Sequence, residues 1–292
     1  MSTSSGLKSR LAAKEILVAP GVYDGLSALL AEQAGAEALY VSGASIAYTR
    51  FGRPDLGLVT MSEVADTVAL ISDRVETPVI VDADNGYGNA MNVQRTVRTL
   101  ERLGARAVQL EDQVFPKKCG HLDGKELIGR GEMAGKIEAA ADARRSDETL
   151  IIARTDAISV EGLDPALERA RAYAEAGADV LFVEAPQSNE QLQAIVRDLG
   201  DLAPLMANMV EGGRTPDLTA AELQEHGFRL VIFPGGLVRA QAHNARRYFE
   251  SLLGNGSNRP FRDDMLDLQG INDVIGTDGM LKAGAHYARD DG

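Results

Sequence analysis

Short apolar runs alternate with longer amphipathic segments along most of the chain. Each run is rich in valine, leucine and isoleucine, and a segment of alanine, leucine, glutamate and arginine follows it. A run that is apolar at consecutive positions is typical of a strand in a parallel sheet with helices on both faces, because neither side of such a strand meets water. The eight runs occupy residues 16–19, 38–41, 79–81, 107–110, 150–153, 180–183, 205–207 and 230–233.

The segments between the runs have the spacing of amphipathic helices. Val93, Val97 and Leu100, for example, recur on one helical face. Several predicted helices end at a glycine directly before the next strand, and glycine ends helices readily because it adopts a left-handed conformation at little steric cost. These glycines are Gly35, Gly104, Gly177 and Gly227.

Eight repeats of strand and helix predict a (β/α)8 TIM-type barrel, which has this number of units in ~250 residues. A doubly wound open sheet is the alternative, but the dinucleotide fingerprint that would favour it is missing. The G-x-G at Gly86–Gly88 follows two aspartates, which would repel a pyrophosphate. The repeat stops after Gly254, so we expect a barrel catalytic domain over residues 1–254 and a C-terminal helical extension over residues 255–292.

Charge and cysteine content narrow the classes of partner. The chain has 30 lysines and arginines against 43 aspartates and glutamates, a net charge of −13 that argues against binding nucleic acid or an anionic membrane. No apolar run approaches the ~20 residues of a spanning helix. The start lacks the apolar core of a secretory signal, although its serine-rich, basic composition leaves a transit peptide as an alternative. One cysteine excludes an intramolecular disulfide and favours a reducing compartment.

Polar residues with catalytic chemistry follow almost every apolar run. In a parallel barrel the active site lies at the carboxyl ends of the strands, so these residues are expected to meet. Ordinary loops draw on serine, lysine and asparagine rather than on carboxylates, so the pattern favours a shared site. The residues are Ser42, Gly43, Asp82, Asp84, Glu111, Asp112, Arg154, Asp156, Glu184 and Asn208.

Asp82 and Asp84 lie two residues apart and are expected to point to one side of a strand end. Two carboxylates held close together repel, and a hard divalent cation removes this cost. Mg²⁺ binds one or two carboxylates and keeps water molecules that substrate oxygens can replace. Glu111 would hold one of these waters. A helix cap or a salt bridge is the alternative for either aspartate. The histidines and the single cysteine lack the spacing of a zinc site.

Cys119 lies in a glycine-containing segment after the fourth run. Lys117, Lys118 and His121 flank it, and nearby positive charge favours a reactive thiolate over an inert thiol. Gly120, Gly124 and Gly129 give this segment the freedom of a loop that covers the barrel mouth.

Arg154 and Tyr40 each have two interpretations. Arg154 directly follows a strand, and its planar fork suits a substrate carboxylate, unless it only balances the neighbouring acids. Tyr40 is either a core residue or a residue whose hydroxyl reaches the barrel mouth.

Six short motifs together resemble the isocitrate lyase and phosphoenolpyruvate mutase superfamily. The resemblance runs in unbroken order from about residue 19 to about residue 245. KKCGH, together with the paired aspartates and ARTD, is specific for the lyase branch of that superfamily. The motifs are VDADNGYG at 81–88, LEDQ at 110–113, KKCGH at 117–121, ARTDA at 153–157, VEAP at 183–186 and NMVEGG at 208–213.

The resemblance implies Mg²⁺-dependent cleavage of a carbon–carbon bond in a small 2-hydroxy carboxylate, with Mn²⁺ as a substitute cation. It also implies a cytoplasmic homotetramer with C-terminal helices exchanged between subunits. Asp82 and Asp84 would bind the metal, with Asp55 and Glu111 acting through waters. Tyr40 would help to deprotonate the substrate hydroxyl, and Cys119 would protonate the resulting enolate, with Lys117 and His121 beside it. The implied substrate-binding residues are Ser42, Gly43, Ala44, Gly120, Arg154, Glu184, Asn208 and Arg239.

One departure from the pattern bears on the substrate. Methylisocitrate lyases usually have an arginine in the C-terminal segment, and this chain has Ile271 near that position. Arg239 remains to meet one distal carboxylate. We therefore expect a 2,3-dialkylmalate, cleaved to an α-keto acid such as pyruvate and a carboxylic acid. The alternatives are 2-methylisocitrate, hydrolysis or decarboxylation of oxaloacetate, and a phosphonate mutase; a non-catalytic scaffold is disfavoured.

Overall fold

The computed structural model describes residues 6–120 and 124–288. Two compact units divide the chain, Met1–Val238 and Arg239–Gly292.

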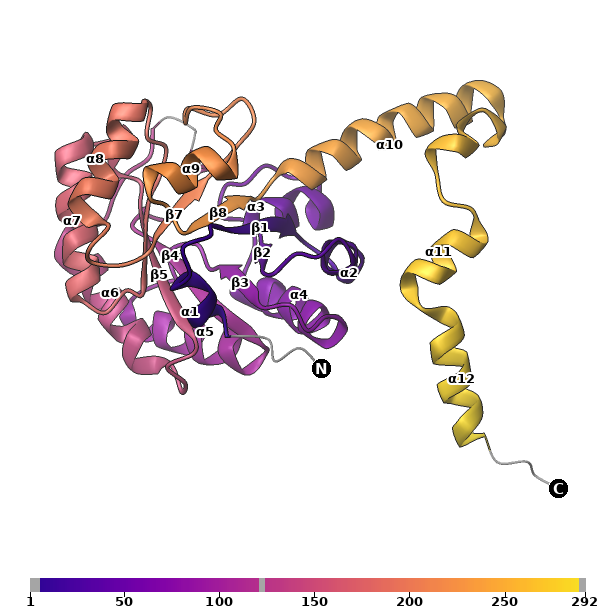
Figure 1. Cartoon of the computed structure of the whole chain (residues 1–292), viewed down its shortest axis with the longest axis horizontal. Coiled ribbons are helices and arrows are strands. Elements are labelled where there is room, and N and C mark those ends of the chain that lie inside the picture. The colour runs from indigo at the N-terminus through magenta and orange to yellow at the C-terminus, as the bar shows by residue number, and fades with distance from the viewer. Residues whose placement is uncertain (1–5, 121–123, 289–292) are drawn as a thin grey trace. The chain divides into compact units, whose positions relative to one another are not determined.

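Within the described residues, eight parallel strands form a closed barrel in sequence order (Figure 1). All eight apolar runs predicted from the sequence are strands, which confirms the (β/α)8 barrel and excludes the open doubly wound sheet. β1 closes the barrel by pairing with both β2 and β8. The strands are β1 Leu17–Val22, β2 Leu39–Val41, β3 Val79–Asp82, β4 Ala105–Glu111, β5 Leu150–Thr155, β6 Val180–Val183, β7 Leu205–Asn208 and β8 Leu230–Phe233.

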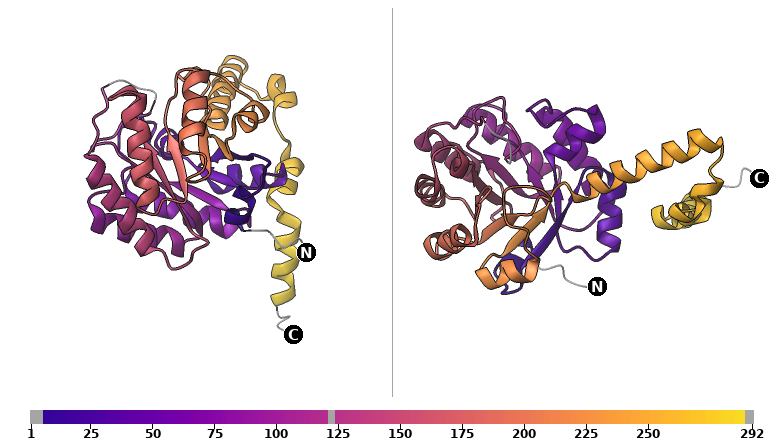
Figure 2. Two further views of the ribbon diagram at one scale, coloured as in Figure 1. Left: turned by 60° about the vertical axis from the view of Figure 1, so that its left-hand side comes forward. Right: turned by 90° about the horizontal axis from the view of Figure 1, so that it is seen from above.

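Helices surround the barrel on its outside (Figure 2). α5 shows why these segments are helical: Asn89 caps its first turn, and Val93, Val97 and Leu100 are buried on one face, as their spacing predicts. The covering helices are α2 Gly25–Gln33, α4 Met61–Arg74, α5 Ala90–Arg102, α6 Arg130–Ala143, α7 Leu163–Glu175, α8 Asn189–Leu199 and α9 Ala220–His226.

Short helical segments lie between these elements. α3 and η1 follow β2, and η2 follows β5. The predicted glycine stops are confirmed, since Gly35, Gly104, Gly177 and Gly227 all have positive φ. The short segments are α1 Leu7–Leu11, α3 Gly43–Ile46, η1 Ala47–Phe51 and η2 Ala157–Ser159.

The interior of the barrel is a packed apolar core. Leu17, Ile80 and Leu230 are fully buried there, so the barrel is not a pore. Leu7 and Leu11 of α1 join the same cluster. Polar side chains are therefore expected to gather at the ends of the strands.

The second unit is helical, and its boundary lies at a different place from the division that the sequence suggests. The two units separate between Val238 and Arg239 rather than after Gly254. The reason is that α10, Gly236–Asn255, continues through Gly254, and Val238 is its one buried residue among those described. The remaining elements are η3 Arg259–Asp264, α11 Leu268–Ile275 and α12 Thr277–Tyr287.

Contacts inside the second unit join η3 to α10. The Phe261 ring packs edge-on against Tyr248 at 5.5 Å between centroids, and Arg247 pairs with Asp264 at 2.8 Å. Among the described helices, none has both the length and the apolar character needed to cross a bilayer.

Candidate active site

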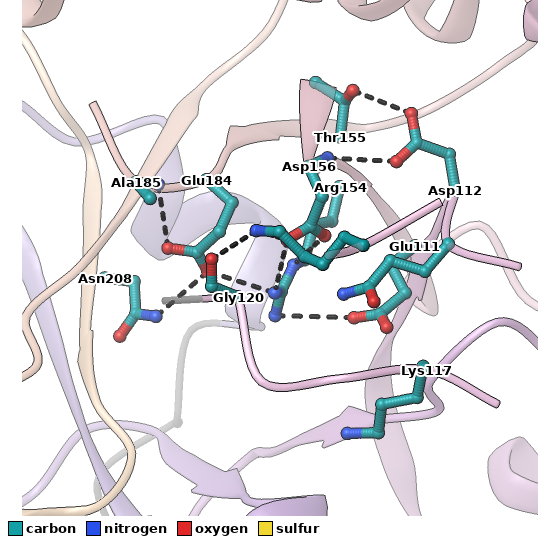
Figure 3. Close-up of polar contacts among 12 residues, drawn as sticks. Glu111, Asp112, Lys117, Gly120, Arg154, Thr155, Asp156, Glu184, Ala185 and Asn208 are labelled. Atoms are coloured by element: carbon teal, nitrogen blue, oxygen red, sulfur yellow. Dashed lines mark hydrogen bonds and ion pairs between the residues drawn. The ribbon is translucent and has the colours of Figure 1, made fainter. Parts of the chain in front are cut away.

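The carboxyl ends of the strands gather the polar residues that the sequence places there. Asp82 ends β3, Glu111 ends β4 and Asn208 ends β7. Arg154 is the next-to-last residue of β5, and Glu184 directly follows β6. All five are buried, and four of them, Glu111, Arg154, Glu184 and Asn208, lie together in one polar cluster (Figure 3).

Arg154 is the centre of this cluster. Its Nε and Nη2 donate hydrogen bonds of 2.9 and 3.0 Å to the two carboxylate oxygens of Asp156. Its Nη1 lies 3.4 Å from Glu111 Oε2, and its Nη2 lies 3.4 Å from Glu184 Oε2. One guanidinium therefore faces three buried carboxylates (Figure 3).

Burial and charge act against each other at Arg154 and Asp156. Burial lowers the pKa of the Arg154 guanidinium, but Asp156, Glu111 and Glu184 together raise it well above its ordinary value. Burial likewise raises the pKa of Asp156, but Arg154 and Lys125 lower it to about 2. Arg154 and Asp156 are thus both charged at neutral pH.

Glu184 is held in place by its neighbours. The Ala185 N–H donates to its Oε1 at 2.8 Å, and Asn208 Nδ2 donates to its Oε2 at 3.0 Å. Ala185 has φ of 57°, an unfavourable conformation for a residue with a Cβ. The backbone strain and the Asn208 amide together hold the Glu184 carboxylate toward Arg154.

A second cluster of carboxylates surrounds Lys117. Its Nζ lies 2.6 Å from Asp55 Oδ1 and 2.8 Å from Asp84 Oδ1. Asp82 lies beside them, because its Oδ1 accepts from the Asp84 N–H at 3.2 Å. Burial raises the pKa of Asp84 to about 7 even though Lys117 opposes the shift, and Asp82 and Asp55 raise it further. Accumulated negative charge is therefore only partly compensated here.

This donor set suits a hard cation. Glu111 Oε1 is buried and accepts no hydrogen bond among the described residues, and burial raises the pKa of Glu111 well above its ordinary value. In the described part of the chain, no three histidine, cysteine or acidic side chains converge into a complete metal site. Mg²⁺ does not need one, because it commonly takes one or two carboxylates and fills its other positions with water and substrate.

The Ser42–Ala44 segment lies directly beside the aspartates. The Gly43 N–H donates to Asp82 Oδ2 at 3.4 Å. A Cβ at Gly43 would lie 3.3 Å from that oxygen, which is a tight contact, and 3.5 Å from Asp84 Oδ1, which is an ordinary one, so a larger residue would crowd the Asp82 carboxylate. Ser42 caps α3 by accepting from the Ser45 N–H.

Tyr40 lies inside the barrel just beneath the acidic cluster. Its hydroxyl donates to Gln109 Oε1 at 2.9 Å, and Gln109 Nε2 in turn lies 3.4 Å from Asp82 Oδ1. Burial, reinforced by the charge of Asp82, raises the pKa of Tyr40 well above its ordinary value. Tyr40 therefore reaches Asp82 through Gln109.

The Cys119 segment approaches the same cluster from the loop between β4 and α6. A Cβ at Gly120 would collide with Arg154 Nη2 and with the Glu184 side chain, so only glycine fits there. The Cys119 side chain is partly exposed next to this contact. His121 lies outside the described residues.

Three residues differ from the simplest expectation or were missed. Asp112 follows a strand, but its side chain points away from the barrel mouth. Its Oδ2 accepts hydrogen bonds from Thr155 Oγ1 at 2.7 Å and from the Tyr173 hydroxyl at 2.8 Å. Gln109 was missed, although a glutamine inside an apolar strand was a usable signal. Lys125 was also missed, because a lysine in a polar loop has no distinguishing pattern. Arg239 is an exposed residue of α10 in the second unit, and its role remains a prediction.

A closed (β/α)8 barrel with buried carboxylates and one arginine at the carboxyl ends of its strands defines a TIM-barrel enzyme. Residues 7–253 match the family model for phosphoenolpyruvate phosphomutase. The chain therefore belongs to the phosphoenolpyruvate mutase and isocitrate lyase superfamily, as its motifs predict.

Curated relatives point to the lyases of this superfamily. The chain is 47% identical over 283 residues to 2-methylisocitrate lyase of Aeropyrum pernix, covering 97% of this chain and 90% of the relative. It is 39% identical over 288 residues to 2,3-dimethylmalate lyase of Eubacterium barkeri, covering 99% of both. These relatives confirm the predicted class, a carbon–carbon lyase.

Solved structures agree on the fold. A crystal structure of 2,3-dimethylmalate lyase matches with a TM-score of 0.91 at 40% identity, covering 98% of this chain and 96% of the other. A structure of oxaloacetate acetylhydrolase with 3,3-difluorooxalacetate matches with a TM-score of 0.91 at 35% identity, covering 98% and 97%. One scaffold thus serves several reactions of small carboxylates.

Proposed function

We propose that this protein is a Mg²⁺-dependent lyase that cleaves a 2,3-dialkylmalate into an α-keto acid such as pyruvate and a carboxylic acid. The supporting observation is the contact between the Cys119 loop and the Arg154 cluster. Gly120, next to Cys119, lies against Arg154, whose guanidinium is surrounded by Glu111, Asp156 and Glu184. The residue next to the proposed proton donor therefore lies against the proposed anion-binding group.

The metal would be held by Asp82 and Asp84, with Asp55 and Glu111 binding its waters. Mn²⁺ is expected to substitute, because it prefers the same oxygen donors. When bound, the ion acts as a Lewis acid toward the oxygens of the substrate. Lys117 would remain as a second cation beside Asp55.

The substrate is proposed to lie between the two clusters. The backbone around Ser42, Gly43 and Ala44 would bind the carboxylate of the α-keto acid half. Arg154 would bind the carboxylate that becomes the departing acid, with Glu184 and Asn208 fixing the guanidinium. The closed contact at Gly120 would exclude water from the intermediate.

The bond changes balance as follows. The substrate hydroxyl would lose its proton to a water molecule, C2 would become a keto carbon, and the C2–C3 electron pair would pass to C3 as an enolate of the departing acid. The Cys119 thiol then donates a proton to C3. The proton taken up by water equals the one that later returns the Cys119 thiolate to the thiol, so no net proton is gained or lost. Because burial keeps the Tyr40 hydroxyl neutral, its proposed part is to relay a hydrogen bond rather than to act as an anionic base. Lys117 and His121 complete the proposed catalytic group.

A dicarboxylate is favoured by the existing ion pairs. Arg154, Lys117 and Lys125 each already pair with at least one buried carboxylate. A third substrate carboxylate would need its own cation, and Ile271 offers none at the C-terminal position. A second candidate, 2-methylisocitrate, is favoured by the 47% identity to the Aeropyrum pernix lyase. Arg239 would meet a distal carboxylate in either case.

A substrate panel tests the proposal. Release of pyruvate from 2,3-dimethylmalate, 2-methylisocitrate and phosphonopyruvate, and of glyoxylate from isocitrate, would be coupled to lactate dehydrogenase. Acetate release would be measured with oxaloacetate. We expect the largest kcat/KM for 2,3-dimethylmalate. A larger value for 2-methylisocitrate would select the second candidate, and turnover of none of the hydroxy acids would overturn the lyase assignment for these substrates.

We further propose a cytoplasmic homotetramer, which the single cysteine and the superfamily membership support. Light scattering on the purified protein would give its mass, and a monomeric mass at assay concentration would contradict this proposal.

A further inference from the structure

Lys125 is a buried lysine that the proposed mechanism does not use. It lies in the loop between β4 and α6, and only 7% of its surface is exposed. A buried ammonium is destabilising unless it is paired and hydrogen-bonded. Its Nζ lies 2.9 Å from Asp156 Oδ1 and also donates to the Gly120 carbonyl oxygen. One ammonium thus connects the barrel to the residue next to Cys119.

Asp156 is a fixed anchor for this connection. Its N–H donates to Asp112 Oδ1 at 2.9 Å, and Asp112 is held in turn by Thr155 and Tyr173. The Asp156 carboxylate also binds both arms of Arg154. Asp156 therefore sets the position of Arg154 and of Lys125 at the same time.

The hydrogen bonds of Gln113, Lys118 and Lys117 join this loop at other points than Gly120 and Asp156. Gln113 exchanges two hydrogen bonds of 2.9 Å with the Lys118 backbone, and Lys118 Nζ donates to the Gly124 carbonyl at 2.5 Å. Those bonds join parts of the loop to one another. Lys117 does reach the barrel, but it binds Asp55 and Asp84 rather than the residues around Arg154.

We propose that Lys125 is the positioning residue for Cys119. By binding Gly120 and Asp156 together, it holds the cysteine at a fixed place relative to Arg154. The kinetic consequence rests on the proposed function, because it assumes that Cys119 donates a proton to a substrate held by Arg154. The positional consequence does not depend on any substrate.

Alkylation of Cys119 by iodoacetamide tests the position directly, because the chain has one cysteine. The rate would be measured from pH 6 to pH 10, so that the plateau at high pH reports access to the thiolate rather than its fraction. We expect the plateau rate of Lys125→Met to rise about tenfold, as local opening becomes easier. A plateau equal to that of the wild type would overturn the proposal.

Lys118→Met is the matched control. It removes a charge next to Cys119 but leaves the link from Gly120 to Asp156 intact, so the midpoint of its pH profile is expected to shift while its plateau stays. An equal rise in the plateau of both variants would overturn the proposal. If Lys125→Met fails to fold, Lys125→Gln replaces it, because that side chain is shorter and uncharged and cannot span both partners. A wild-type plateau in that variant would likewise overturn the assignment.

Turnover gives the second readout. We expect Lys125→Met to lower kcat about 10- to 100-fold through misplacement of the proton donor, with KM and Mg²⁺ affinity changed less than about threefold. An unchanged kcat, or a loss confined to KM, would contradict the positioning role. If the wild type cleaves no substrate in the panel, the proposed function fails while the alkylation result still decides the position of Cys119.

Discussion

Arg154 and Asp156 bind each other through two hydrogen bonds although only Thr155 separates them along the chain. Alternate residues at the end of β5 point to opposite sides, so Arg154 and Asp156 face the mouth while Thr155 faces Asp112. The ARTD motif therefore places a preformed ion pair inside the barrel and attaches its far side to the outer layer. This arrangement gives an oriented guanidinium before any substrate arrives.

For turnover, the orientation of the Arg154 guanidinium should matter more than its positive charge. A lysine keeps the charge but cannot bind a carboxylate through two parallel bonds, so Arg154→Lys is expected to lower kcat/KM about 100-fold. Steady-state pyruvate release would measure it. Arg130→Lys, at an exposed pair with Glu168, is the control and should leave turnover unchanged. Equal activity of Arg154→Lys and wild type would show that the fork is not required.

Asp156 should make the protein sensitive to acid. Its pKa of about 2 is below its ordinary value, so its contribution to stability is fully present above about pH 4 and is lost as pH falls through 2. Between these values, Asp156→Asn should show a shallower fall in the free energy of unfolding, by up to ~1.4 kcal/mol per pH unit. Urea titrations at pH 4.5, 3.5 and 2.5 would measure this difference. Identical slopes would contradict it, and Glu168→Gln is the exposed control.

A methyl group at position 43 should weaken metal binding. The added Cβ of Gly43→Ala would crowd the Asp82 carboxylate, so Mg²⁺ affinity is expected to fall about tenfold. Isothermal titration with MgCl2 would measure it. Gly25→Ala adds the same group where nothing lies within 4 Å and should bind Mg²⁺ like the wild type. Unchanged affinity in Gly43→Ala would argue against a metal next to these aspartates.

Removal of the metal should abolish turnover. Without a divalent cation the acidic cluster repels an anionic substrate, so EDTA treatment and desalting are expected to leave less than about 1% of activity. Activity should return on adding Mg²⁺ or Mn²⁺ but not Ca²⁺ at equal concentration, because the larger ion prefers more ligands. Full activity after EDTA treatment would refute the metal requirement.

Replacement of the thiol should stop catalysis and leave the fold intact. A serine hydroxyl is a much weaker acid, so Cys119→Ser is expected to lose at least about 100-fold in kcat. Circular dichroism and the unfolding midpoint should match the wild type, because Cys119 is only partly buried. Near-normal turnover would require another proton donor.

The sequence predicted the barrel, and which residues lie at the ends of its strands, because parallel strands have a repeating signature and a known functional end. A residue such as Asp82 needs only its place after an apolar run to be assigned to the mouth. The direction of a side chain was harder to predict. Asp112 also follows an apolar run, as Asp82 does, yet it faces the outer helices because Tyr173 and Thr155 donate hydrogen bonds to it there.

Two features were not predicted from the sequence, because they depend on the tertiary fold. The first feature is the burial of Lys125, which is stabilised because Asp156, 31 residues away in sequence, accepts a hydrogen bond from its ammonium. The second feature is the division of the chain, which was expected after Gly254 because the repeat of strand and helix stops there. α10 continues through Gly254 to Asn255, and the compact units separate between Val238 and Arg239. Local patterns report helix and strand, whereas these features are decided by what the tertiary fold brings nearby.

Closure of the barrel also constrains synthesis of the protein. β1 needs β8 as a neighbour, with Leu17 beside Leu230 in the ladder. At about 5–20 residues per second, the ribosome takes roughly 10–40 s to make the chain between these strands. During that interval one edge of β1 has no partner strand, and unpaired edges promote aggregation. Until the eighth strand emerges, this edge of β1 is therefore open to pairing with a strand of another chain.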